Sequence, residues 1–246
     1  MLTIVGNGPS RLKYDLNEIG EWWGCNRIYT DATPDLLFAG DIDMQAEIIH
    51  EQKYYYNNKL FMGGFEWLDM SMWDMIKFGF ASHDQIREFR HPEDTLFCVQ
   101  GNADSADLLG YNPAHSGNII MYNNLLLRNL FTGMVALGYA CESGRKEVEL
   151  AGFDALDPSQ DDVSNVYEGL KNYEPYYTKQ SRVYDAQRSQ FIALLKHFPD
   201  VKIYWKKSLD ERELIDYNEL PYYINNREWL LGIGFADDHE NMDNPF

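Results

Sequence analysis

The chain has 246 residues, of which 45% are hydrophobic and 15% aromatic, and its formal net charge is -18. This apolar content excludes a disordered chain and is enough to build one folded domain of ordinary size. The acidic balance disfavours a protein that binds nucleic acid or an anionic membrane surface, because both would repel it.

The three cysteines, Cys25, Cys98 and Cys141, have neither the paired spacing of a disulfide framework nor that of a zinc site. A reducing compartment fits this pattern. The N-terminus has no basic or long apolar segment of the kind found in signal peptides. No run of the chain approaches the roughly 18 apolar residues that are needed to cross a bilayer. The sequence therefore predicts a soluble, cytoplasmic protein with no membrane span.

Short apolar runs bounded by glycine or proline alternate with segments of helical spacing along the first part of the chain. They predict strands at residues 2–5, 25–29, 36–39 and 59–62, a helix or an irregular helical turn at residues 10–23, and a helix at residues 44–56. Residues 65–92 are rich in Met, Trp and Phe without clean periodicity. We interpret this segment as a lid or an insertion.

The same alternation continues in the second part of the chain. It predicts strands at residues 96–99, 147–151 and 201–205, and helices at residues 118–139 and 181–198, the first of them interrupted near Thr132-Gly133. Strands that alternate with helices are typical of a doubly wound, mostly parallel sheet with helices on both faces. We therefore predict a single α/β domain at residues 1–236, followed by a solvated acidic tail at residues 237–246.

The first predicted strand ends in a glycine-rich turn, Gly6-Asn7-Gly8-Pro9-Ser10. Its two glycines would leave backbone N–H groups exposed to a ligand, and phosphate is the natural guest of such a turn. Asn7 and Ser10 add side-chain donors, and Pro9 stiffens the backbone. The glycine spacing matches neither the P-loop nor the dinucleotide fingerprint, and a purely structural turn is the alternative.

Two further motifs follow this turn in order, Cys25-Asn26 and the run ELAGFD, which ends at Asp154. Together the three motifs resemble the bacterial sialyltransferases that use CMP-sialic acid. They are also similar to the motility-associated flagellin glycosyltransferases and the hydroxymethylpterin pyrophosphokinase-like proteins. The resemblance covers residues 1–50 and 120–210. It implies a Rossmann-like sheet of the GT-A-variant type, a CMP-linked nonulosonic acid or related donor, a glycan or other hydroxyl acceptor, and no required cofactor.

The resemblance also implies a nucleotide site at the carboxyl edge of the sheet, where ligands of doubly wound folds bind. Its residues would be Gly6, Asn7, Gly8 and Ser10 in the turn, Asn26 after the second strand, Thr132 and Gly133 at the start of a helix, and Gly152 at the end of a later strand. A helix N-terminus attracts anions, which suits a phosphate beside Thr132.

The catalytic residues match the family less well. The family places a histidine base just before its last long helix, and the corresponding residue here is Gln180, which cannot accept the proton. The family's arginine ahead of the Ser/Thr-Gly pair corresponds to Asn129 in an ungapped register, with Arg128 directly beside it. Asp154 would orient the donor. Hydroxyl and cationic groups that could replace the missing ones cluster in the loop before the last long helix, at Tyr173, Tyr176, Tyr177, Lys179 and Arg182. Asp154, Tyr177 and Gln180 are therefore the catalytic candidates, with aromatic packing as the alternative for the tyrosine.

Two other interpretations stay open. A nucleotide-binding or structural protein that kept the fold and lost catalysis would explain Gln180. A pyrophosphokinase-like enzyme would use Asp41 as a Mg²⁺ ligand with an ATP-type donor, supported by the preceding Pro34-Asp35 pair. A helix cap is the structural alternative for Asp41. The methionine-rich stretch at residues 62–80 could cover the active site or a second subunit, so a homo-oligomer is possible.

Overall fold

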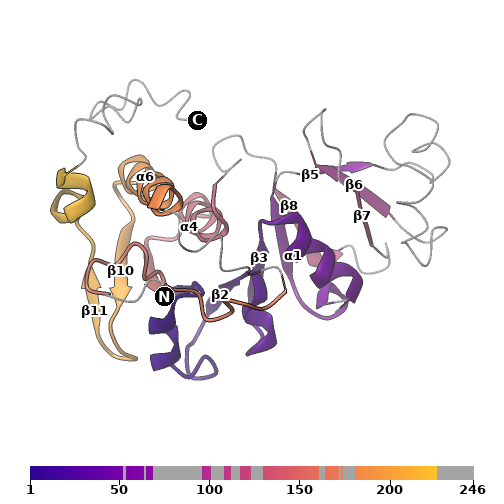
Figure 1. Cartoon of the computed structure of the whole chain (residues 1–246), viewed down its shortest axis with the longest axis horizontal. Coiled ribbons are helices and arrows are strands. Elements are labelled where there is room, and N and C mark those ends of the chain that lie inside the picture. The colour runs from indigo at the N-terminus through magenta and orange to yellow at the C-terminus, as the bar shows by residue number, and fades with distance from the viewer. Residues whose placement is uncertain are drawn as a thin grey trace.

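The structure is a computed structural model. It describes residues 1–51, 54–63, 65–68, 96–100, 108–111, 117–122, 130–160, 164–171, 173 and 181–225. Within these residues the chain forms an eight-stranded sheet and a separate three-stranded sheet (Figure 1).

The large sheet has the order β11-β10-β9-β1-β2-β3-β4-β8. Its strands are β11 (Arg212–Leu214), β10 (Lys202–Lys206), β9 (Glu147–Ala151), β1 (Leu2–Val5), β2 (Trp22–Cys25), β3 (Leu36–Ala39), β4 (Leu60–Gly63) and β8 (Ile119–Tyr122). Every neighbouring pair is parallel except β10 and β11, which pair antiparallel at the edge. The predicted mostly parallel α/β sheet is therefore confirmed.

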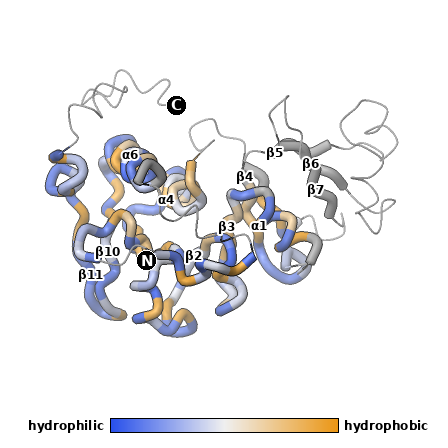
Figure 2. The backbone as a smooth tube through the Cα atoms, viewed as in Figure 1, coloured by the Kyte–Doolittle hydropathy of each residue, from blue (hydrophilic) through white to orange (hydrophobic). Residues whose placement is uncertain are grey.

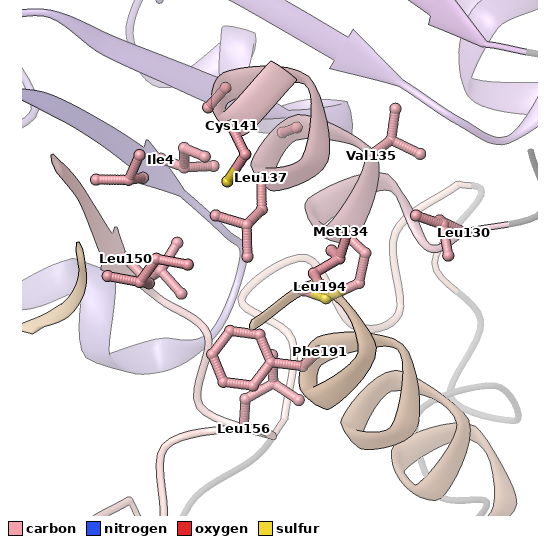
Figure 3. Close-up of a cluster of buried hydrophobic side chains, with 14 of the residues drawn as sticks. Ile4, Leu130, Met134, Val135, Leu137, Cys141, Leu150, Leu156, Phe191 and Leu194 are labelled. Carbon is pink, nitrogen blue, oxygen red and sulfur yellow. The ribbon is translucent and has the colours of Figure 1, made fainter. Parts of the chain in front are cut away.

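Two long helices, α4 (Thr132–Glu142) and α6 (Ser181–His197), pack on one face of this sheet. Ile4 of β1 and Leu150 of β9 point toward Leu137 of α4 and Phe191 of α6 (Figure 3). All four side chains are at most 1% exposed. Burying an aliphatic or aromatic side chain of this size contributes roughly 1.5–3 kcal/mol. This cluster therefore fixes the two helices on the central strands.

The opposite face is covered by the short helix α1 (Ile42–Ala46) and by a π-helical turn, Glu47–Glu51. Met44 and Ile48 pack there with Val5 and Leu37, which point away from α4 because side chains alternate along a strand. Helices thus cover both faces, as predicted. Figure 2 shows hydrophobic stretches along the central strands and α4, and hydrophilic ones along the outer loops.

Strands β3 and β9 have the predicted limits, and β1 matches as well. These strands are buried on both faces, and each is followed directly by a glycine, which makes their limits readable. β9 also contains Glu149, which is buried and paired with Lys206 of β10. Helix α6 also agrees within one residue of the prediction.

The second predicted strand, at residues 25–29, is wrong. The strand is Trp22–Cys25, and a 3₁₀ helix, Asn26–Thr30, follows it. Asn26 has a φ of 53°, a left-handed backbone conformation that ends the strand. The predicted helix at residues 10–23 is limited to a 3₁₀ helix, Pro9–Lys13.

The predicted helix at residues 118–139 is wrong in its first part, because Ile119–Tyr122 is strand β8 and the helix begins at Thr132. Ile119 and Ile120 pair with Leu60 and Phe61 of β4, and an apolar run this short does not distinguish a strand from a buried helix. The predicted helix at residues 44–56 is likewise divided into α1, the π-helical turn and a 3₁₀ turn, Tyr54–Tyr56.

The small sheet is an insertion between β4 and β8. Its strands β5 (Phe65–Leu68), β6 (Leu96–Gln100) and β7 (Leu108–Tyr111) pair antiparallel. β5 contacts β8, and β7 contacts the π-helical turn. The predicted strand at residues 96–99 is thus present, but in the small sheet. Residues 69–95, which make up most of the predicted lid, and the predicted tail at residues 237–246 lie outside the described residues.

None of the helices in the described part of the chain combines the length and apolarity that crossing a bilayer requires.

Candidate functional site

The carboxyl edge of the large sheet has a topological switch point at β1. The chain adds β2, β3, β4 and β8 on one side of β1, and then returns to place β9 on the other side. From such a point the connections after the two strands lead to opposite sides of the sheet, and ligands of open α/β sheets commonly bind there. The predicted nucleotide turn and the residues after β9 therefore belong to one corner of the molecule.

The two glycines of the turn bond to the end of β9. The N–H of Gly6 donates to the carbonyl of Ala151 over 2.8 Å, and the N–H of Gly8 donates to the carbonyl of Gly152 over 2.9 Å. A Cβ on Gly6 would lie 2.5 Å from the carbonyl oxygen of Gly152, whose own φ is +69°. The prediction that these amide groups face a phosphate is therefore wrong, because glycine is needed here for the contact between two backbones.

The anion that occupies the turn is a carboxylate of the protein itself. The N–H of Ser10 donates to Oδ2 of Asp154 over 2.7 Å, and the Ser10 hydroxyl donates to Oδ1. A Cβ on Gly8 would lie 2.5 Å from Cγ of Asp154, so this glycine makes room for the carboxylate. Asp154 is 4% exposed. The structure thus corrects the predicted roles of Ser10 and Asp154, which bond to each other.

The pKa of Asp154 reflects this position. Burial raises the pKa of the carboxyl group, the hydrogen bonds from Ser10 oppose the rise, and the neighbouring Asp157 adds to it. Each carboxylate oxygen accepts a hydrogen bond from Ser10, and Asp154 is buried, so its described contacts hold the turn rather than a ligand.

Asn7 lies between the ends of β1 and β2. Its Nδ2 donates to the carbonyl of Cys25 over 3.1 Å and to the hydroxyl of Tyr173 over 3.3 Å. Its Oδ1 is buried and has no hydrogen-bond partner among the residues that the structure describes. A buried acceptor without a partner costs roughly 1–3 kcal/mol, and such atoms in native proteins need an explanation. A buried water or a bound ligand with a donor group would supply one.

Asn26 follows β2 and connects it to the end of β3. Its Nδ2 donates to Oδ2 of Asp41 over 3.3 Å, and its Oδ1 accepts from the N–H of Gly40 over 3.4 Å. Asparagine tolerates the left-handed backbone better than most residues that have a Cβ, because its short amide can form local hydrogen bonds. The positive φ of 53° thus aims a carboxamide along the edge of the sheet.

The left-handed backbone at Asn26 can be tested without a ligand. Asn26→Gly and Asn26→Ala both remove the carboxamide, but only alanine places a Cβ on a residue with positive φ. We therefore expect Asn26→Ala to lower the free energy of unfolding by about 1–2 kcal/mol more than Asn26→Gly, measured by urea denaturation. Equal stability of the two variants would contradict the left-handed conformation.

Asp41 lies at this edge beside Asn26, which donates to its carboxylate. Desolvation raises the pKa of its carboxyl group, the hydrogen bond from Asn26 opposes this, and the charge of Asp43 adds to the rise. Asp41 is the N-cap residue of α1 and its carbonyl accepts from the N–H of Gln45 over 2.9 Å, but its side chain makes no capping hydrogen bond. Within the described ranges no group of three or more His, Cys, Asp or Glu residues could hold a metal ion.

The Pro34-Asp35 pair, which supported a magnesium site, has a structural role. Oδ2 of Asp35 accepts a hydrogen bond of 2.8 Å from the N–H of Trp22 at the start of β2. This carboxylate therefore lies at the amino end of its strand, away from the candidate site.

Helix α4 begins at the same edge of the sheet. Its N-cap residue, Phe131, provides no side-chain cap, and the N–H of Met134 donates to the Phe131 carbonyl over 2.7 Å. The amides of Thr132 and Gly133 are therefore the first-turn donors that could face an anion. A Cβ placed on Gly40 would lie 2.3 Å from Oγ1 of Thr132, which puts this hydroxyl against the end of β3. A Cβ on Gly133 would meet the ring of Phe153 at 2.7 Å, so Gly133 allows the helix to approach the loop after β9.

Two arginines near this edge are neutralised by carboxylates of the protein. Arg11, which is 3% exposed, pairs with Asp31 and donates to the hydroxyl of Tyr167 over 2.8 Å. Arg27 donates to both oxygens of the buried Glu47, over 2.8 and 3.0 Å. These pairs fix loops on the sheet and leave neither guanidinium as a free countercharge for a ligand.

The structure thus brings Asn7, Asn26, Asp41 and Thr132 to one edge and joins the first two through Tyr173. Tyr177 and Gln180 lie outside the described residues. Sequence reasoning included Tyr173 only as one of several tyrosines in its loop. Its contact with Asn7 joins residues 166 positions apart, and no local pattern signals such a contact.

These features define an α/β protein with a mostly parallel sheet and a polar candidate ligand site at its carboxyl edge. No protein-family model matches the chain, and no curated protein matches it by sequence. Its fold is similar to that of the sialyltransferase CstII from Campylobacter jejuni, solved with the substrate analogue CMP-3FNeuAc, with a TM-score of 0.42 and 13% identity over 83% of this chain and 79% of that one. A second structure of CstII, with cytidine-5'-monophosphate, gives a TM-score of 0.36 and 12% identity over 83% of this chain and 78% of that one.

Proposed function

We propose that this protein is a glycosyltransferase that binds a nucleotide-activated sugar at the carboxyl edge of its large sheet. The donor would be a CMP-linked nonulosonic acid or a related sugar, and the acceptor a glycan or another hydroxyl compound. The observation that supports this proposal most is the group of Asn7, Asn26 and Asp41 beside the uncapped start of α4. Carboxamides and a carboxylate recognise hydroxyl and amino groups, and a helix N-terminus attracts a phosphate.

The charges at this edge divide the proposed site into two parts. The first-turn amides of α4 at Thr132 and Gly133 would hold the phosphate, since the helix dipole is positive there. The carboxylate of Asp41 repels a phosphate and accepts hydrogen bonds, so it would face hydroxyl groups of the ribose or the sugar. Asn26, which is bonded to Asp41, would lie between the two parts.

The same charges favour a donor that is linked through a single phosphate. A diphosphate brings more negative charge beside Asp41, and Arg11 and Arg27 are already paired with Asp31 and Glu47. A CMP-type donor has one phosphate between nucleoside and sugar, so its repulsion from Asp41 is smaller. This argument supports CMP over nucleoside diphosphates.

A nucleotide-binding protein without catalysis is the second candidate. It is favoured by the bond between Ser10 and Asp154, which uses the carboxylate that was expected to orient the donor, and by Gln180 at the position of the family's base. A magnesium-dependent, pyrophosphokinase-like enzyme would instead use Asp41 as a ligand and require Mg²⁺ for nucleotide binding.

Nucleotide titrations distinguish these candidates. We expect CMP without Mg²⁺ to stabilise the protein against thermal unfolding, by about 2.7 kcal/mol at 100 times its dissociation constant. At the same concentration, CDP, UDP, GDP and ATP, each tested with and without Mg²⁺, should stabilise the protein less than CMP does. Stabilisation by ATP only with Mg²⁺ would support the pyrophosphokinase-like enzyme, and no effect of any nucleotide would contradict a nucleotide site. In Asn26→Gly, which removes the carboxamide but suits the backbone, the effect of CMP should decrease.

Catalysis requires a separate measurement. If the wild-type protein releases CMP from CMP-sialic acid and the Asn26→Gly variant does so more slowly, the result supports the glycosyltransferase. Binding of CMP without such release, in the presence of a range of glycan acceptors, would support the protein without catalysis.

A further inference from the structure

The contacts of Tyr173 connect it to both strands that contribute to the proposed site. Its hydroxyl accepts from Nδ2 of Asn7 over 3.3 Å and from the backbone N–H of Arg27 over 3.4 Å. It also interacts with the side chain of Asn26. A single hydroxyl group therefore lies between the residues that follow β1 and β2.

The orientation of the Asn7 carboxamide follows from its neighbours. The carbonyl of Cys25 can only accept a hydrogen bond, so the nitrogen of the carboxamide must face it. The second hydrogen of this nitrogen is used by the Tyr173 hydroxyl. Both donors of Asn7 are thus bonded within the protein, and Oδ1 is left as a buried acceptor without a described partner.

A partner for this oxygen must be a donor, which a phosphate oxygen is not. Hydroxyl groups of a ribose and the amino group of cytosine are donors. This revises the prediction that Asn7 donates to phosphate. The role of the Tyr173 hydroxyl is then clear, because without it one hydrogen of the Asn7 nitrogen loses its acceptor and the carboxamide is held by the Cys25 carbonyl alone.

We propose that Tyr173 is a positioning residue, which fixes the Asn7 carboxamide with its oxygen directed at a hydroxyl or amino group of the bound nucleotide. This inference rests on the proposed nucleotide site and specifies how the site selects its ligand. Tyr173 would act through Asn7 and would not itself read the nucleotide.

The test compares ligands that each lack one donor. CMP, 2′-deoxy-CMP, 3′-deoxy-CMP and UMP are titrated by calorimetry into the wild-type protein and into Tyr173→Phe. In the wild type we expect one of the three analogues to bind about tenfold more weakly than CMP, since one hydrogen bond to the protein is lost. In Tyr173→Phe this ratio should fall to about threefold or less, because the carboxamide is no longer fixed.

Tyr167→Phe is the matched control. The Tyr167 ring lies 5.5 Å from that of Tyr173, and its hydroxyl bonds to Arg11 and Asp31 but not to Asn7. This variant should lose thermal stability and keep the wild-type ratio between the ligands. A purely structural tyrosine at position 173 would give the same result as Tyr167→Phe.

The outcomes separate this inference from the proposed function. A wild-type protein that binds none of the four nucleotides would contradict the nucleotide site, and the inference with it. Binding of CMP with the same ligand ratios in the wild type and Tyr173→Phe would overturn the positioning role alone. Equal affinity of the wild type for all four ligands would overturn it as well.

Discussion

Gly152→Ala should destabilise the protein by about 3–5 kcal/mol, the largest effect that we expect from a single methyl group in this chain. Two costs add at this position. The φ of +69° is unfavourable for any residue with a Cβ, and the Cβ would lie 2.7 Å from the carbonyl oxygen of Gly6. That oxygen belongs to the backbone at the end of β1, so relief would require a shift of the strand. The free energy of unfolding in urea measures the sum.

Gly144→Ala separates the two costs. Gly144 has a φ of +86°, and nothing lies within 4 Å of the position that its Cβ would occupy. This variant should therefore pay only the backbone cost, about 1–2 kcal/mol. Similar destabilisation by both variants would show that β1 and β9 do not approach each other at Gly6 and Gly152.

Asp154→Ala should lower the free energy of unfolding by about 2–4 kcal/mol, because it removes the acceptor of two charge-assisted hydrogen bonds from Ser10. Ser10→Ala removes only one of the two, that of the hydroxyl, and should cost about 1–2 kcal/mol. In the double variant the two effects should not add, since both residues take part in one contact. Urea denaturation of the three variants completes the cycle.

The same variants test whether Asp154 acts in catalysis. Formate supplies a free carboxylate of the size that Asp154→Ala removes, and we expect it to restore part of the stability of this variant but not of Ser10→Ala. If Asp154→Ala kept wild-type stability but lost CMP-sugar hydrolysis, Asp154 would orient the donor. That result would contradict the structural role indicated by its hydrogen bonds with Ser10.

The sequence predicts the central strands well because burial and glycine mark them. β1 and β3 are short, mainly apolar runs, as expected for parallel strands covered on both faces, and β9 has Val148, Leu150 and Ala151 between and after its two glutamates. A glycine follows each of the three strands, at Gly6, Gly40 and Gly152. The predicted sheet with helices on both faces follows from the alternation of these strands with α4 and α6.

The errors have a different physical origin. β8 is a strand because Ile119 and Ile120 pair with β4, which lies far away in the sequence. The end of β2 depends on the left-handed backbone of Asn26, which is not visible in a pattern of polar and apolar residues. Long-range pairing and single backbone conformations thus decided where the elements begin and end.

The candidate site was predicted in place but not in its contacts. The sequence located Asn7, Asn26 and Thr132 at the edge of the sheet. It could not show that Gly6 and Gly8 face the segment after β9. A glycine in a sequence does not reveal whether a ligand or another part of the backbone lies against it. Only the distances to Gly152 and Asp154 distinguish them.

The mutual fit of the segments after β1 and β9 has an evolutionary consequence. A side chain gained at Gly6 or Gly152 clashes with the opposite backbone, and one gained at Gly8 clashes with Asp154. The two segments should therefore have been inherited as a matched pair, so that a substitution in one survives only with a compensating change in the other. Homologues too divergent to align over their full length should still be recognisable by the joint presence of both.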